Sequence, residues 1–377
     1  MKTIRIGIIG VGQIGKAHLD VYKTIRGVEI VAACGRSREN LENVALKYGV
    51  PHIYQDFREL LKRDDLDAVD VCLHNNLHAP VAIAALEAGK HVYCEKPIAG
   101  SYHDGATMLN AAERSGRMLH IQLAGLFSNE TRAAKQLIDA GALGDVYHAR
   151  SVGFRRRGRP YVDGYGSASF VQKEISGGGA LFDMGIYHIS PLLYLMDMPK
   201  PVRISGKIYQ KTGMYVDRRE KGGYNVEELG LGFVRFENDV TMDIFESWAV
   251  HMDKMDCSAI MGTKGGIKLE PFSYHTTQGD MELDCKGNLA EMNIRRQCTG
   301  NNADLYSTMF ADTSNYQAPP LVHWVAALRN EVKLLPTAQI ALGAMLLQEG
   351  IYLSDALGRE MTAEEVIITS KSTALEV

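Results

Sequence analysis

A glycine-rich turn directly after the first predicted strand constrains the fold of this chain more than any other feature. Residues 3–9 form a largely apolar run typical of a buried strand, and a helical pattern begins near Lys16. In such a strand–turn–helix unit, the three glycines permit a tight turn, a close approach of phosphate to the backbone, and close packing of helix on strand. Free N–H groups at the helix start favour an anion. The segment therefore predicts a dinucleotide site formed by Gly10, Gly12, Gln13, Ile14 and Gly15.

The pattern of apolar residues divides the chain into two parts. Through residue 123, short apolar runs alternate with helical segments, among them a helix predicted over 79–88. This alternation predicts an α/β domain with a Rossmann-type, doubly wound parallel sheet. Later stretches alternate polar and apolar residues with period two and predict a C-terminal α/β domain with a large, open, mostly antiparallel sheet, including a hairpin turn at 262–266. We therefore predict a dinucleotide-binding domain at 1–123 and a substrate-binding and oligomerisation domain at 124–377.

Composition excludes several classes of partner. The 377 residues carry a formal net charge of -4, which gives no general attraction to nucleic acid or to anionic membranes. The six cysteines are scattered, with no spacing suited to zinc and no CxxC pair. The sequence shows no leader segment and no apolar run as long as the roughly 18 residues of a membrane span. The expectation is a cytoplasmic protein without a metal site, whose partners are small molecules or other copies of itself.

Further candidates follow three other predicted strands. In open parallel sheets the ligand lies beyond the carboxyl ends of the strands. The charged Glu-Lys pair at 95–96 is an unusual choice for such an edge, and Pro97 favours a cis or sharply turned peptide that aims the Lys96 ammonium at a nicotinamide. The predicted cofactor-binding residues at these strand ends are Gly35, Arg36, Ser37, Leu73, Asn75, His78, Glu95, Lys96 and Pro97.

The end of the second strand bears on the choice of cofactor. Sites specific for NAD place an acidic residue on the adenosine ribose about 20 residues beyond the glycines. Here that position reads Gly35-Arg36-Ser37, without a carboxylate, and Glu39 is the one nearby acid. We expect Arg36 to contact a 2′-phosphate, so that the cofactor is NADP or NAD, with NADP favoured.

A second group of chemical side chains follows the three glycines at 177–179. These glycines lead into a predicted helix that carries Asp183, Tyr187 and His188. Asp183 and Tyr187 are four residues apart and share one face of the helix, whereas His188 is turned by about 100°. A histidine in this setting is a candidate for proton transfer, and a satisfied core histidine is the alternative.

The motifs GVGQIG, AALEAGKHVYCEKP and GGGALFDMGIYH together resemble the Gfo/Idh/MocA family, named after glucose-fructose oxidoreductase, inositol dehydrogenase and rhizopine catabolism. The resemblance covers essentially the whole chain. It implies a Rossmann domain, an α/β domain whose open sheet forms an oligomer interface, and NAD(P)-dependent oxidation or reduction of sugars, inositols and related polyols.

The resemblance also assigns roles to individual residues. The family's lysine corresponds to Lys96 and its aspartate to Asp183. The family's catalytic histidine or tyrosine falls on Tyr187, with His188 directly behind, so either can be the group that transfers the proton. Lys96 would then stabilise the reacting oxygen and Asp183 would orient the proton-transfer group. The family's usual Arg-Phe pair is replaced here by Leu126-Phe127, which alters the expected substrate contacts.

The segment from Arg155 to Lys173 is the candidate substrate region. It is rich in arginine and tyrosine, whose donors and aromatic faces suit a polyhydroxylated ring, and its glycines favour a mobile loop. A solvated run of charges is the alternative interpretation, and we expect Trp248 to pack in the core or an interface. The candidate substrate residues are Arg156, Arg157, Tyr161, Tyr165 and Lys173.

Together these features predict an NAD(P)-dependent dehydrogenase or reductase acting on a CH–OH group of a sugar, glycoside or cyclitol. Similarity to glycoside 3-oxidising members of the family, carried by Leu126-Phe127-Ser128 and RRRGRPY, points to C3 of a glucoside. The alternatives are a cofactor-binding regulator without turnover and a reductase of imines or other non-sugar carbonyls. We expect a homo-oligomer, a dimer or tetramer formed through the C-terminal sheet.

Overall fold

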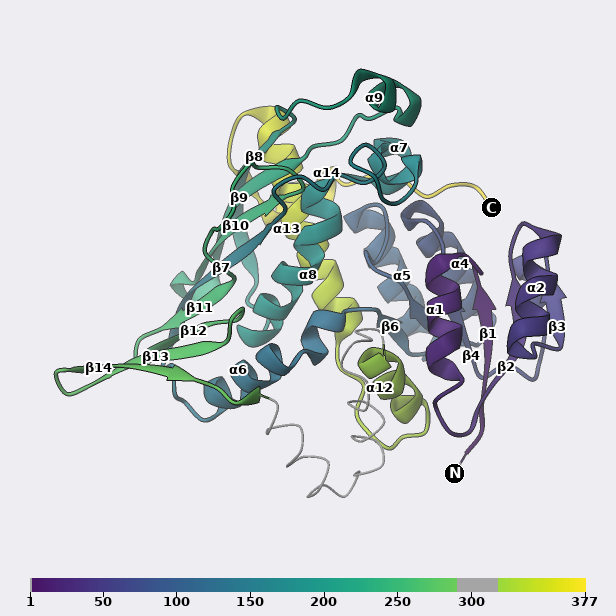
Figure 1. Ribbon diagram of the computed structural model, residues 1–377. Helices are drawn as coiled ribbons and strands as arrows, with labels where there is room; N and C mark the ends of the chain where they lie inside the picture. The colour runs from purple at the N-terminus through teal and green to yellow at the C-terminus, as the bar shows by residue number, and fades with distance from the viewer. Residues whose placement is uncertain (1, 290–317) are drawn as a thin grey trace.

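The computed structural model describes residues 2–289 and 318–377, and its first part is a six-stranded parallel sheet (Figure 1). The strands are β1 (Ile4–Ile9), β2 (Val28–Cys34), β3 (His52–Tyr54), β4 (Ala68–Val71), β5 (His91–Cys94) and β6 (Leu119–Ile121). Their order is β3-β2-β1-β4-β5-β6, and every neighbouring pair is parallel. The predicted doubly wound sheet is confirmed. The order reverses between β1 and β4, where such sheets bind ligands beyond the strand ends.

Five helices connect these strands: α1 (Gln13–Tyr22), α2 (Arg38–Tyr48), α3 (Phe57–Leu61), α4 (Asn75–Glu87) and α5 (Tyr102–Ser115). The prediction that this helix begins at residue 79 is wrong, because α4 begins at Asn75 and Pro80 lies in its second turn. Proline has no N–H and leaves the carbonyl four residues earlier without its helical partner. That carbonyl, on Asn76, instead accepts a hydrogen bond from the backbone N–H of Leu375 in the C-terminal tail, at 3.1 Å.

The second part contains a nine-stranded sheet with the order β14-β13-β12-β11-β7-β10-β9-β8-β15. Only the β7–β10 pair is parallel among these described strands, so the predicted mostly antiparallel sheet is confirmed, as is the hairpin at 262–266 between β11 and β12. The strands are β7 (Val146–Phe154), β8 (Pro201–Tyr209), β9 (Leu229–Phe236), β10 (Thr241–Ser247), β11 (Ala259–Gly262), β12 (Gly265–Lys268), β13 (Ser273–Gln278), β14 (Met281–Lys286) and β15 (Met361–Thr362).

Helices cover the face of this sheet that points toward the first domain (Figure 1). The central pair, α8 (Ala180–Leu195) and α13 (Thr337–Leu357), packs together and against β7, β8, β9 and β10. The other helices described are η1 (Ala124–Phe127), α6 (Asn129–Asp139), η2 (Ala168–Val171), α7 (Lys173–Ser176), α9 (Val216–Gly222), η3 (Glu237–Asp239), α12 (Ala318–Leu328) and α14 (Ala363–Thr369).

Helix α13 is the one described helix that is long and apolar enough to cross a membrane by length and composition. Its packing argues for a core helix, because it contacts α5 and β6 of the first domain as well as α8 and β8 of the second. Thr337 at its start also accepts a hydrogen bond from the backbone N–H of Ile121, at 3.0 Å. The C-terminal segments therefore return to the first domain, and the boundary predicted at residue 123 stays a prediction.

The cysteines within the described residues are all free: Cys34, Cys72, Cys94, Cys257 and Cys285. Cys34 and Cys94 are buried, and Cys72 is partly buried. Cys298, the sixth, lies outside the described residues.

Candidate active site

The turn between β1 and α1 has the geometry that a dinucleotide phosphate needs. Gly10 has φ 101°, and a Cβ there would collide with the Cys72 carbonyl; one on Gly15 would collide with the Gly10 carbonyl. Gly12 instead faces open space, with nothing within 4 Å of the position that a Cβ would take. Helix α1 has no side-chain N-cap and no acidic residue in its first turn, so its N–H groups are available to an anion. The predicted roles of these glycines fit this geometry.

The residues after β2 form a positively charged edge beside this turn. Arg36 is exposed, and Ser37 caps helix α2 by accepting a hydrogen bond from the Asn40 N–H at 3.2 Å. Gly35 packs against Val11 and Leu41, where a Cβ would lie 2.9 Å from a Val11 methyl carbon. The edge therefore presents a guanidinium, and the cap of α2 is a hydroxyl instead of a carboxylate.

The residues after β4 divide between two tasks. Leu73 lies against the glycine turn, its side chain 3.0 Å from the position of a Cβ on Gly10. Asn75 instead donates to the Ser176 carbonyl at 2.7 Å and so links the two domains. His78 is fully buried, with its ring nitrogens 2.8 Å from the Pro97 carbonyl oxygen and 3.1 Å from that of Leu73. His78 therefore links the segments that follow β4 and β5.

The residues after β5 bring the first domain's lysine to the second domain. The Lys96–Pro97 peptide is cis. Lys96 Nζ lies 2.9 Å from Asp183 Oδ1 on α8 and 4.2 Å from the centre of the Tyr187 ring. Lys96 and Asp183 are 87 positions apart along the chain, and the fold joins them with Tyr187 in one cluster.

Helix α8 is held in place by a buried carboxylate that the sequence analysis did not single out. Glu227, next to β9, accepts hydrogen bonds from the backbone N–H groups of Gly179 and Leu181 at 2.9 to 3.0 Å, and from the Tyr352 hydroxyl at 2.9 Å. Burial raises the pKa of Glu227, although these donors lower it. A carboxylate at a helix N-terminus satisfies free N–H groups and complements the helix dipole. It fixes the helix that carries the candidate catalytic residues.

Tyr187 and His188 occupy different surroundings on α8. Tyr187 is 37% exposed and borders a small pocket that also includes Lys96, Gln122 and Leu126. His188 Nδ1 lies 2.9 Å from Glu246 Oε2 on β10, toward the nine-stranded sheet. Gly153 lies in strand β7, and a Cβ there would collide with both His188 and Glu246. A glycine at this position therefore leaves the space that the His188–Glu246 pair occupies.

The electrostatics of the cluster keep its ion pair charged. Burial alone would lower the pKa of Lys96, but Asp183 and Tyr187 together act against it and the pKa lies above its ordinary value. Burial likewise acts to raise the pKa of Asp183, and Lys96 lowers it below its ordinary value. Trp248, fully buried as expected, donates its indole N–H to Asp183 Oδ2 at 3.3 Å. The pKa of Tyr187 is raised by burial despite the nearby ammonium, so its phenol is protonated at neutral pH.

The candidate substrate residues are spread over a loop with its own small core. Tyr165 is 43% exposed, packs under the Arg155 guanidinium and hydrogen-bonds to it. The pKa of Tyr165 is raised to about 12 by burial, and Asp183 and Lys96 also act on it, so Tyr165 lies within electrostatic reach of the ion pair. Arg155 likewise acts on Asp183 and lowers its pKa, although our candidates began at Arg156.

The other candidates in this segment have different surroundings, and their proposed contact with substrate stays a prediction. Tyr161 packs with the buried cluster around Val162 and Val171, and Arg157 pairs with Asp163 at 2.9 Å. The remaining candidates, Arg156 and Lys173, are exposed. Leu126 and Phe127 are buried in η1, which borders α8.

Arg159 departs most from the interpretation of this segment as a solvated run of charges. It is fully buried and bonds to Asp163 at 2.8 Å and to Glu228 at 2.9 Å. It also donates to the carbonyls of Thr212 and Gly213, which ties the loop to the segment after β8. No local signal marks this residue, because Arg159 looks like its exposed neighbours in the sequence.

We expect Arg159→Met to destabilise the protein by about 3 kcal/mol, because it leaves buried carboxylates without their counter-charge. The measurement is the free energy of unfolding in urea. Arg157→Met is the matched control, since Arg157 pairs with the same Asp163 but its side chain is 43% exposed, and we expect a loss of less than about 1 kcal/mol. Equal losses in the two variants would contradict the assignment.

Comparison with protein families gives two matches along the chain. Residues 4–123 match the family described as "Oxidoreductase family, NAD-binding Rossmann fold", and residues 131–268 match the "GFO/IDH/MocA C-terminal domain". The two matches follow one another in the order expected from the two sheets.

Individual relatives and solved structures agree with these matches. The chain is 29% identical to a D-glucoside 3-dehydrogenase of Escherichia coli (strain K12), over 85% of this chain and 90% of that one. It is 35% identical to an inositol 2-dehydrogenase of Salmonella typhimurium, over 39% of this chain and 46% of that one. A levoglucosan dehydrogenase in complex with NADH and levoglucosan shares the fold, with a TM-score of 0.76 at 20% identity, over 96% of this chain and all of that one.

Proposed function

The chain belongs to the Gfo/Idh/MocA oxidoreductase family, and from that premise we propose that it is a dehydrogenase of a sugar or glycoside that oxidises a ring secondary hydroxyl. The observation that carries the proposal is the cluster of Lys96, Asp183 and Tyr187 beyond the carboxyl end of β5. It joins a partly buried ion pair to a protonated phenol at the edge of the sheet where ligands bind in folds of this type. The nicotinamide, when bound, accepts or supplies the hydride.

The side chains have separable tasks in this proposal. The Lys96 ammonium donates a hydrogen bond to the reacting oxygen and stabilises its developing negative charge. Asp183 holds Lys96 at 2.9 Å and is itself held by the Trp248 indole. Tyr187 exchanges the proton of the substrate hydroxyl, because its ring lies over Lys96, whereas His188 is bound to Glu246 on the sheet side.

The proposed substrate is a pyranose or glycoside oxidised at C3. Support comes from the D-glucoside 3-dehydrogenase relative, which covers most of both chains. Arg155 and Tyr165, which lie within electrostatic reach of the ion pair, offer donors and an aromatic face that suit a hydroxylated ring. The test is to incubate the protein and cofactor with glucose, aryl glucosides and inositol and to identify a ketone product two mass units lighter.

The same assay separates this proposal from its alternatives. A regulator would bind the cofactor and turn over none of the alcohols, and an imine reductase would consume only imines or non-hydroxylated ketones. Oxidation of inositol alone would overturn the glycoside proposal. The position of attack is read by NMR of the ketone, and a ketone at a carbon other than C3 would overturn that assignment.

The proposed cofactor preference rests on the edge after β2. Arg36 is exposed beside the glycine turn and Ser37 is occupied in capping α2, so the guanidinium is available to a 2′-phosphate. We expect NADP to bind at least as tightly as NAD. Arg36→Ala should weaken the binding of NADP by about tenfold and leave the affinity for NAD unchanged. Fluorescence titration with both cofactors checks this. Tighter binding of NAD by the wild type, with no effect of the substitution on NADP, would contradict it.

The proposed homo-oligomer rests on the face of the nine-stranded sheet away from α8 and α13 (Figure 1). Large apolar side chains are exposed on its strands, including Tyr147 (49%), Val202 (43%) and Phe233 (37%). Such a face is a typical site of subunit contact. Light scattering coupled to size exclusion measures the subunit number, and a monomer at all concentrations would overturn this proposal.

A further inference from the structure

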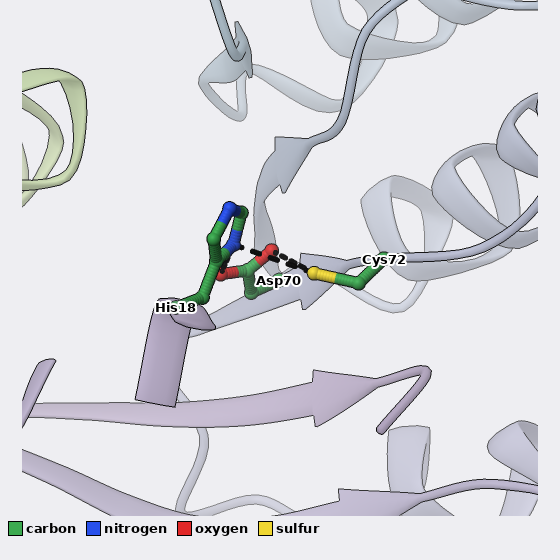
Figure 2. Close-up of side chains that lie close together, drawn as sticks. All are labelled: His18, Asp70 and Cys72. Carbon is green, nitrogen blue, oxygen red and sulfur yellow. Dashed lines mark hydrogen bonds and ion pairs between the residues drawn. The ribbon is translucent and has the colours of Figure 1, made fainter. Parts of the chain in front are cut away.

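A buried group of charged side chains lies behind the catalytic lysine, in the core of the first domain. His18 on α1 points between two carboxylates: its Nδ1 lies 2.8 Å from Asp70 Oδ2 on β4, and its Nε2 lies 3.0 Å from Glu95 Oε1 after β5. Figure 2 shows the His18 ring and the Cys72 sulfur on the same Asp70 carboxylate. Cys72 is partly buried, the other three are buried, and His18 and Asp70 have no exposed surface.

The geometry determines the protonation of His18. Each ring nitrogen faces an oxygen of a carboxyl group. An ionised carboxylate can only accept, so both nitrogens donate when both carboxyl groups are ionised. Burial by itself would lower the pKa of His18, but Asp70 and Cys72 together act against it and the pKa lies well above its ordinary value. Burial would raise the pKa of Glu95, and the hydrogen bond from His18 brings it below its ordinary value. The histidine is therefore an imidazolium that contacts the ionised Glu95 carboxylate on one side and Asp70 on the other.

His18, Asp70 and Cys72 also have the side-chain types of a metal site, with ligand atoms within 4.8 Å of one another. We interpret them as a hydrogen-bonded group instead. The 2.8 Å contact between His18 and Asp70 is a direct hydrogen bond, and the remaining His18 nitrogen is used by Glu95. Burial raises the pKa of the Cys72 thiol, so it stays protonated and donates to Asp70 at 3.3 Å.

Glu95 connects this group to Lys96. One of its carboxylate oxygens is bound to His18, and the other accepts the backbone N–H of Lys96 at 3.0 Å. The far end of Lys96 is held by Asp183. The lysine is thus fixed at its main chain through Glu95 and at its ammonium through Asp183.

We propose that His18 is a positioning residue for hydride transfer, which keeps Glu95 ionised and oriented and thereby sets the place of the Lys96 ammonium. This rests on the proposed function, in which Lys96 acts on the reacting oxygen. Removing His18 leaves two buried carboxyl groups without the cation that lies between them, which favours uptake of a proton by Glu95. The hydrogen bond to the Lys96 N–H then weakens. A displacement of about 1 Å at a reacting group costs up to about 10²-fold in rate.

The kinetic test uses His18→Gln, Glu95→Gln and the double variant. We expect His18→Gln to lower kcat by about 10- to 100-fold, with cofactor affinity nearly unchanged. Because both substitutions act through one contact, the double variant should be no slower than the slower single variant. His91→Gln is the matched control, since His91 begins the same β5 strand and its Nδ1 accepts from the Met118 N–H, and it should keep the wild-type kcat.

The pH profile separates positioning from a merely structural role. In the wild type, the lowered pKa keeps Glu95 ionised as the pH falls. Without His18, burial raises that pKa, so kcat of His18→Gln should decline between about pH 8 and about pH 5, where the wild type holds its rate. Other titratable groups interact with His18, Asp70 or Glu95, and they are present in both the wild type and the variant. They are Tyr22, Cys72, His78, Tyr93, Cys94, Lys96 and Tyr187.

An independent readout needs no substrate. Nitrogen NMR of the histidine-labelled protein should show both His18 nitrogens protonated at neutral pH, and one unprotonated nitrogen would overturn the inference. A wild-type kcat and pH profile in His18→Gln would overturn the inference as well. So would a loss of kcat in the double variant that equals the product of the losses in the two single variants. If His18→Gln does not fold, the kcat of Glu95→Gln and the NMR experiment still test the proposed role of His18. A wild type inactive on every polyol defeats the proposed function, whereas the NMR result tests His18 separately.

Discussion

Lys96→Met is expected to lower kcat by about 10²-fold or more, because the ammonium that stabilises the reacting oxygen is lost. Cofactor affinity should stay nearly unchanged, since the proposed site of the cofactor phosphates is the glycine turn and not Lys96. The substitution also removes the partner of Asp183, whose lowered pKa depends on Lys96. Steady-state kinetics together with cofactor titration measure both effects.

Lys96→Arg is the control for charge alone. It keeps a cation beside Asp183, but the planar guanidinium cannot occupy the same point as the ammonium. We expect it to fold like the wild type and to recover only part of the activity. Wild-type turnover in Lys96→Met would remove Lys96 from the chemistry and with it the proposed mechanism.

Tyr187→Phe is expected to lower kcat by about 10²-fold or more, because proton transfer to or from a positioned side chain contributes at least that much. The change removes one oxygen and keeps the ring that packs against the Lys96 ammonium at 4.2 Å. Its effect should therefore lie in turnover and not in folding.

His188→Gln is the matched comparison on the same helix. An amide can still bond to Glu246, so we expect a much smaller loss of kcat than in Tyr187→Phe. The reverse order would assign proton transfer to His188. In that case the buried Glu246, which accepts from the Ser151 hydroxyl at 2.8 Å, would serve to hold His188 and raise its pKa against the effect of burial.

The first domain's architecture could be predicted from the sequence because its signals are local. The positions of Gly10, Gly12 and Gly15 follow from what a strand, turn and helix require within six residues, and the structure gives each glycine the close contact or open space that this predicts. The spacing of four also places Asp183 and Tyr187 on one face of a helix. The start of helix α4 was mispredicted, because the partner that satisfies its Asn76 carbonyl comes from the C-terminal tail.

The contacts that orient the candidate site are set by pairings far apart along the chain. His18 meets Glu95 across 77 residues, Arg159 meets Glu228 across 69, and His188 meets Glu246 across 58. Nothing in the local pattern separates buried Arg159 from exposed Arg156, or Glu227 at the start of α8 from any surface glutamate.

The sequence by itself determined which residues are candidates for the chemistry and which local structures present them, because glycine geometry, strand runs and helical spacing act over a few residues. Only the tertiary structure decided which charges are buried, which are paired and therefore which proton each group holds. Burial opposes charge and a nearby opposite charge restores it, and both depend on what the fold brings within hydrogen-bonding distance. That is why Lys96, Glu95 and His18 became one connected group only in the folded chain.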